Sequence, residues 1–174
     1  MLSLVFLILG LVVGVIHLYF DKQPRMRVRV AQIFLQWILV MTVGVGSLFF
    51  FIAHTVMAKS TAQSIGWPAG NPFQSEVAVA NLTIATLGIL SFWIRGNFWV
   101  ATVVAFSVQW LGAAVVHIRE IVVAQDYAPN NAGMTLYLDI LIPLILIGLL
   151  VYYLYATRHE QGRNPTEPPM GQVV

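Results

Sequence analysis

The sequence predicts an all-α integral membrane protein, a bundle of five transmembrane helices. Of its 174 residues, 59% are hydrophobic and 9% are charged, whereas an ordinary soluble domain is about 45–50% apolar and about 25% charged. A soluble chain of this length has too little interior to bury so much apolar surface. In addition, five separate apolar stretches each reach the length of about 20 residues that a helix needs to cross a bilayer.

The five predicted spans are, in order, 2–20, 30–56, 77–94, 98–124 and 134–156. The first lacks the basic region and the Ala-x-Ala site of a cleaved signal peptide, so we expect it to remain as a helix. The second and fourth are longer than a bilayer requires, so we expect them to tilt or to extend beyond the membrane. The third and fifth follow loops rich in proline, glycine and asparagine, 60–76 and 125–133, which we expect to form tight turns.

The basic residues predict how the bundle is oriented. If five helices alternate, seven Lys and Arg residues fall on the side that holds loop 21–29 and the C-terminal tail, and two, Lys59 and Arg119, fall on the other. Because basic loops are retained in the cytoplasm, the N-terminus is predicted outside and the C-terminus inside.

The helices form one predicted domain, 1–158. The polar, Pro-rich tail at 159–174 is expected to be disordered unless a partner holds it.

Composition also excludes several classes of function. The formal net charge of +2 comes from few and scattered charges, which excludes nucleic acid as a partner. The chain has no cysteine, so a disulfide, an iron–sulfur cluster, a thiolate zinc site and a haem attached through cysteines are excluded as well.

Five ionisable residues are the candidates for a functional site. An ionisable side chain inside a spanning helix costs about 2.5 kcal/mol or more, so each one needs a partner or a function. Counting along the helices at about 1.5 Å per residue places five of them in the outer quarter of the membrane, on four different helices. They are His54, Glu76, His117, Glu120 and Asp139.

This set predicts a pocket that binds one divalent metal ion or a proton. His117 and Glu120 are three residues apart and therefore share a helix face. Two imidazoles with two or three carboxylates suit zinc, iron or manganese. Asp139 lies in an apolar run without a cationic neighbour, so we expect it to face the interior of the bundle and to bond to Asn81, Gln109 or His117.

Three alternatives remain open from the residues alone. The polar groups can simply be solvated at helix ends, with Glu76 capping its helix. A haem can be ligated between His54 and His117, with Lys59 and Arg119 at its propionates, although three carboxylates would crowd those anions. The chain can also be an accessory subunit of a larger membrane complex, or a homo-oligomer, whose polar residues only join helices. Whether it is an enzyme stays undecided.

Several motifs resemble those of one family. The segment Gly66–Glu76 with Asn81, the segment Tyr127–Gly133 with Asp139, and the residues around Phe98 and Gly112 are similar to a family of small bacterial and archaeal membrane proteins that is known only as a domain of unknown function. The resemblance covers the second to fifth helices. It implies a multi-pass protein of the cytoplasmic (inner) membrane without an assigned activity.

Overall fold

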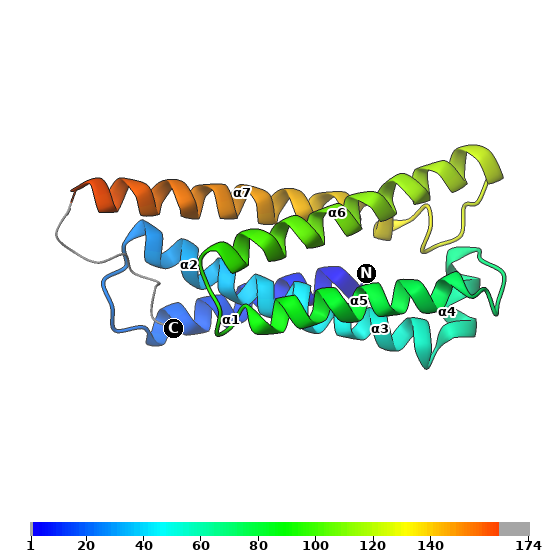
Figure 1. Cartoon of the computed structure of the whole chain (residues 1–174), viewed down its shortest axis with the longest axis horizontal. Helices are drawn as coiled ribbons and strands as arrows, with labels where there is room; N and C mark the ends of the chain where they lie inside the picture. Colours follow the sequence, from blue (N-terminus) through cyan, green and yellow to red (C-terminus); the bar gives the residue numbers. More distant parts are fainter. Residues whose placement is uncertain (1, 164–174) are drawn as a thin grey trace.

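The structure, a computed structural model, describes residues 2–163 and is helical throughout its regular elements. Five of its helical segments are long and apolar enough to cross a membrane, which confirms the predicted all-α bundle (Figure 1). The elements are α1 Leu2–Phe20, α2 Arg27–Ile38, the π-helix η1 Leu39–Gly46, α3 Ser47–Thr55, α4 Ala58–Ile65, α5 Phe73–Leu90, α6 Asn97–Arg119, the π-helix η2 Glu120–Ala124 and α7 Met134–Arg163.

The first predicted span coincides with α1, and the third differs most from its helix. Helix α5 begins at Phe73, four residues before the predicted start. It therefore includes one polar turn ahead of the apolar run. The side chain of Asn71 accepts a hydrogen bond from the Phe73 amide at 2.9 Å and so satisfies a backbone donor at the helix start. The helix ends at Leu90 rather than at residue 94, because the chain turns there and reverses through Gly96 at φ +65°.

The second span is one continuous helical rod with a wide turn in its middle. Helices α2 and α3 are joined by η1, where the backbone bonds follow the wider π pattern. This segment packs closely on α5: a methyl group placed on Gly88 would overlap the backbone of Gly44. The absence of side chains at both positions therefore lets the two helices touch backbone to backbone.

The loop predicted at 60–76 contains a short helix instead of turns alone. Helix α4 turns across the end of the bundle and buries Ala62 and Ile65. It ends at Gly66, whose φ of +88° is the left-handed conformation in which helices commonly terminate. We call this side of the molecule the α4 end.

The core runs along the centre of the bundle, and apolar side chains also cover its outside. Large residues such as Leu35, Trp99 and Phe106 are fully enclosed between α2, α6 and α7. Apolar side chains on the outer faces, among them Val15 and Val108, are more than half exposed, as expected for helices that lipid surrounds.

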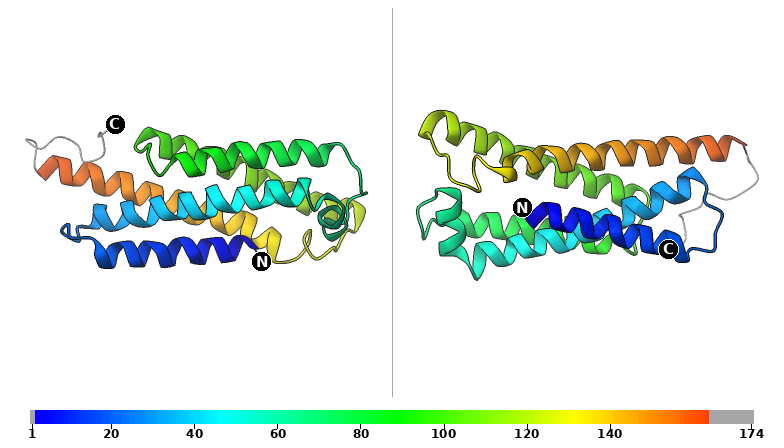
Figure 2. Two further views of the ribbon diagram at one scale, coloured as in Figure 1. Left: turned by 90° about the horizontal axis from the view of Figure 1, so that it is seen from below. Right: turned by 180° about the vertical axis from the view of Figure 1, so that it is seen from behind.

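Helix α1 does not reach the α4 end. Figures 1 and 2 show that it begins part-way along the bundle, near the start of α7, while α3, α5 and α6 extend further. The space beyond the first turn of α1 is where the candidate site lies.

Candidate functional site

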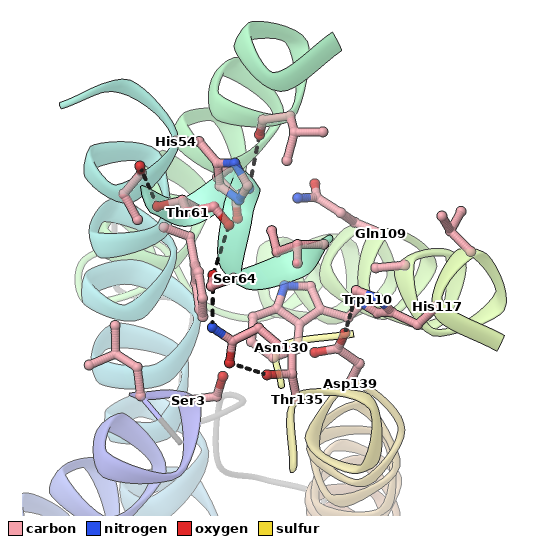
Figure 3. Close-up of a pocket in the computed structure, with 18 of the residues that line it drawn as sticks. Ser3, His54, Thr61, Ser64, Gln109, Trp110, His117, Asn130, Thr135 and Asp139 are labelled. Carbon is pink, nitrogen blue, oxygen red and sulfur yellow. Dashed lines mark hydrogen bonds and ion pairs between the residues drawn. The ribbon is translucent and has the colours of Figure 1, made fainter. Parts of the chain in front are cut away.

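A cavity of about 460 Å³ occupies the α4 end of the bundle. Residues from α1, α3, α4, α5, α6 and α7 and from the segment 125–133 surround it, and most of its lining surface is apolar (Figure 3). Its polar lining residues are Ser3, His54, Thr61, Ser64, Asn81, Gln109, His117, Asn130, Thr135 and Asp139. A hollow of this size with mostly apolar walls and convergent polar groups is typical of a small-molecule site.

His117 of α6 and Asp139 of α7 face each other at this cavity. His117 Nε2 lies 3.5 Å from Asp139 Oδ2, and the two residues are only 9% and 6% exposed. Asp139 therefore faces the interior as predicted, and of its three predicted bonding partners His117 lies against it. At 3.5 Å the contact is longer than a good hydrogen bond, so it is a close approach of two titratable groups whose charges depend on where their proton lies.

The other nitrogen of His117 is held by Asn131, which is fully buried. Asn131 donates through Nδ2 to the backbone carbonyl of Asp126 at 2.7 Å, and its Oδ1 lies 2.6 Å from His117 Nδ1. Because the amide group is already donating on one side, its oxygen must accept on the other. His117 therefore carries a proton on Nδ1 and directs Nε2 at Asp139.

His54 reaches the same cavity from the last turn of α3. Its side chain is 8% exposed, and its Nδ1 is enclosed without a hydrogen-bond partner anywhere in residues 2–163. The ring packs against Trp67, with 6.4 Å between the two ring centroids. A buried ring nitrogen without a partner is costly in free energy and is therefore unusual at a purely structural position.

The segment 125–133 closes the cavity and is tied to α4. The Asn130 amide donates to the Ser64 carbonyl at 3.0 Å, and its side-chain amide donates to Ser64 Oγ at 3.1 Å. These two bonds, together with the contact between Asn131 and His117, join α4, α6 and the segment before α7 into one unit. Trp67 of the 60–76 loop and Asn130 of this segment both line the cavity, so the two segments cover it together.

Three of the five predicted site residues, His54, His117 and Asp139, share this cavity, and two carboxylates lie outside it. Glu76 is exposed in the first turn of α5. Glu120 pairs with its neighbour Arg119 at 2.7 Å on the surface. Within the part of the chain that the structure describes, no group of three or more His, Asp or Glu residues is close enough to share a metal ion.

Sequence reasoning missed two residues that shape the site, Asn131 and Trp110. Asn131 lies in a turn-rich segment, where asparagine is ordinarily explained by turn formation. Trp110 lies in an apolar helix, where an aromatic residue is ordinarily a packing residue. Trp110 precedes His117 by about two turns of the same helix, whereas Asn131 is 14 positions from His117 in the chain, so no local spacing pointed to it.

Comparison with known families identifies one that matches nearly the whole chain. The sequence profile of a family of unknown function, DUF6790, matches residues 1–160. The chain belongs to this family. The match extends over all five spans and includes His54, His117 and Asp139, so the cavity lies inside the family domain. Neither a curated protein nor a solved structure matches the chain.

Proposed function

We propose that this DUF6790 protein is a multi-pass protein of the cytoplasmic (inner) membrane that binds and releases a proton at His117 and Asp139. In this proposal the α4 end faces the outside. The observation that carries it is the buried contact of 3.5 Å between His117 Nε2 and Asp139 Oδ2, with the other ring nitrogen held by Asn131.

The hydrogen bond to Asn131 supports this proposal because it restricts how the pair can hold protons. With Nδ1–H committed, one further proton belongs between Nε2 and Oδ2, either on the carboxyl group or on the ring, and the pair is then neutral overall. Loss of that proton leaves a buried carboxylate facing a ring lone pair, and gain of another leaves a buried imidazolium. Two groups so strongly coupled titrate as one unit.

Infrared difference spectroscopy of the purified protein during a pH titration tests this role. We expect a carbonyl band of a protonated carboxyl group that changes together with the ring bands of a histidine. The band should be absent from Asp139→Asn. It should persist in the matched variant Glu120→Gln, because Glu120 lies outside the cavity. A titrating band that survives in Asp139→Asn, or no titrating carboxyl band in the unaltered protein, would refute the proposal.

A divalent metal ion is the second candidate ligand of the same pair. Two ligand atoms that each lie about 2.0–2.2 Å from one tetrahedral zinc ion are separated by roughly the distance observed between Nε2 and Oδ2. A hydrogen bond from the other ring nitrogen to an amide oxygen is also the usual support of a metal-binding histidine. His54 lines the same cavity but is not close enough to share an ion with the pair in the described residues, so the hypothesis rests on His117 and Asp139 as the two protein ligands. A haem would have to displace Asp139 from His117, and we do not propose it.

Thermal unfolding with and without added zinc tests the metal hypothesis. We expect zinc to raise the Tm of the unaltered protein and to leave the Tm of Asp139→Asn unchanged. Metal analysis of protein extracted in mild detergent is the second measurement. If zinc does not shift the Tm and no metal co-purifies, the metal hypothesis is wrong, while the proton hypothesis is still judged by the infrared titration.

A further inference from the structure

We propose that the cavity binds a small, neutral and mainly apolar molecule, and that an oxygen of this molecule accepts a hydrogen bond from the indole N–H of Trp110. The inference rests on the proposed function in one respect, the overall neutrality of the His117–Asp139 pair. It adds the chemical class of the ligand.

The first argument is the shape and chemistry of the walls. The cavity of about 460 Å³ is lined by rings and branched side chains, among them Phe50, Ile65 and Trp110. Two further lining residues, Leu2 and Val116, are also exposed on the outer surface, at 38% and 46%. We infer that these side chains form an apolar edge of the cavity that faces lipid, through which an apolar molecule can enter without crossing water.

The second argument is that polar groups in the cavity lack protein partners. The Trp110 side chain is 5% exposed, and its ring nitrogen makes no hydrogen bond to any of residues 2–163. Figure 3 shows the indole nitrogen directed toward the space between Asn130 and His54. An indole N–H is a donor only, so the complementary group on a ligand is an acceptor.

His54 provides an independent observation of the same kind. Its ring is more than nine-tenths buried, and its Nδ1 has no partner among the described residues. Gln109 also projects into this region (Figure 3). Unpaired polar groups around an apolar hollow are stabilised when a ligand supplies the missing hydrogen bonds.

The third argument is charge. The cavity lining contains neither lysine nor arginine among the described residues, so an anionic ligand such as a fatty acid would find no cation there. The lining has a single carboxylate, Asp139, which His117 already contacts. A cationic ligand would have to compete with that imidazole. A neutral molecule with an acceptor oxygen, such as a ketone, ester or quinone, has neither disadvantage.

Equilibrium binding of three probes to the protein in lipid nanodiscs tests the inference. The probes are menadione, which is neutral and has two carbonyl oxygens, decanoate as the anion and tetraphenylphosphonium as the cation. The chain has no cysteine that menadione could alkylate. We expect saturable binding of menadione only. Absence of saturable menadione binding, or tighter binding of either ion, would overturn the ligand class.

Two measurements examine the hydrogen bond. Trp110→Phe keeps an aromatic ring and removes the N–H, and it should weaken menadione binding about fivefold, the value of one neutral hydrogen bond. The matched variant Trp93→Phe, at an exposed position outside the cavity, should leave the affinity unchanged. In the unaltered protein, menadione should shift the indole N–H resonance of Trp110 and leave that of Trp93 in place. An unshifted Trp110 resonance under saturating menadione would refute this contact even if the variant does not fold.

The outcomes separate this inference from the proton-binding proposal. If menadione fails to bind while Asp139 still titrates, only the proposed ligand class is refuted. If menadione binds at Trp110 while no carboxyl group titrates, only the proposed proton site is refuted.

Discussion

At the scale of single residues, one buried amide sets the chemistry of the site. Asn131 connects the backbone of the 125–133 segment to the imidazole of His117, so the fold of a surface segment decides which ring nitrogen faces Asp139. The histidine could be selected from the sequence because of its depth, but its tautomer depends on a residue that is 14 positions away in the chain.

Replacing Asn131 with leucine should destabilise the protein and release the orientation of His117. The variant removes two buried hydrogen bonds and leaves the Asp126 carbonyl and His117 Nδ1 without partners, at a cost of about 1–3 kcal/mol each. Thermal unfolding in detergent should show a clearly lower Tm, and nitrogen NMR should show a mixture of ring tautomers. Asn97→Leu, at an exposed position, is the control and should change neither. An unaltered tautomer in Asn131→Leu would contradict the role assigned to the amide.

Asp21 contributes to the stability of the folded protein in a pH-dependent way, at the end of the bundle opposite the α4 end. Arg29 Nε donates to Asp21 Oδ2 at 2.6 Å, and this hydrogen bond holds the pKa of the Asp21 carboxyl group below its ordinary value of 3.8. A lowered folded-state pKa means that the stabilisation is complete above the unfolded-state pKa of about 3.9 and is lost as the pH falls through the folded-state value.

The Tm difference between the unaltered protein and Asp21→Asn should therefore be constant from about pH 7 to about pH 5 and should shrink toward zero in more acidic solution. Thermal unfolding of both proteins across this range measures it. Arg29→Gln should show the same behaviour, since it removes the same contact. A difference that grows on acidification would show that the ion pair is not its source.

At the scale of the elements, the spans could be predicted from composition, but the irregular helices could not. Apolar length is a local property of the chain, so the limits of α1 and of the rod formed by α6 and η2 follow from it. The π turns of η1 depend on how this rod packs against α5, at a contact between Gly44 and Gly88 that are distant in sequence. Helix α4 is too short and too polar to be predicted as a membrane span from composition. Its buried residues, Ala62 and Ile65, are buried by the end of the bundle that the helix covers.

Gly88→Ala should separate η1 from α5 and lower stability. The added methyl group would overlap the Gly44 backbone, and forced insertion into packed structure typically costs about 1–3 kcal/mol. The matched variant is Gly112→Ala, also inside a helix, where nothing lies within 4 Å of the added methyl group. It should be neutral or stabilising by about 0.5–1 kcal/mol. Equal Tm values for the two variants would contradict the close contact.

Gly66→Ala should loosen the connection between α4 and the segment that carries Asn131. Gly66 has φ +88°, and an added methyl group would overlap the carboxylate of Asp126. Gly70→Ala is the control, because Gly70 has a similar φ of +84° but nothing within 4 Å. In both variants alanine must adopt a left-handed backbone conformation, which costs about 1–3 kcal/mol of stability. Only Gly66→Ala adds the overlap with the Asp126 carboxylate. We expect a larger loss of Tm in Gly66→Ala, with faster hydrogen exchange at the Asn131 amide.

At the scale of the whole molecule, the position of a residue along the length of the bundle could be predicted better than its direction around a helix. Each residue adds about 1.5 Å along the axis, so the five candidate side chains were placed near one membrane surface by counting. Direction depends on which neighbouring helix packs where. His117 and Glu120 illustrate this, since they are three positions apart and yet one faces the cavity and the other the surface. At 3.6 residues per turn, three positions correspond to a rotation of about 300°, so Glu120 lies about 60° around the helix axis from His117.

The orientation of the bundle also belongs to the whole molecule, and it determines which side of the membrane the cavity faces. Five spans place the termini on opposite sides. The basic residues of loop 21–29 lie at the end away from α4, together with Arg95 and the C-terminal part of α7, whereas the α4 end has only Lys59 and Arg119. Because basic loops are retained in the cytoplasm, this distribution predicts that the α4 end, and the cavity with it, faces the outside.

The absence of cysteine from the chain makes this orientation directly measurable with single-cysteine variants. Ser60→Cys is a nearly isosteric change at an exposed position of the α4 end, and Gln23→Cys is exposed in the basic loop at the other end. A membrane-impermeant maleimide added to intact right-side-out vesicles should label Ser60→Cys and should label Gln23→Cys only after the vesicles are opened. The opposite pattern would place the cavity in the cytoplasm, and His117 and Asp139 would then exchange protons with that compartment instead.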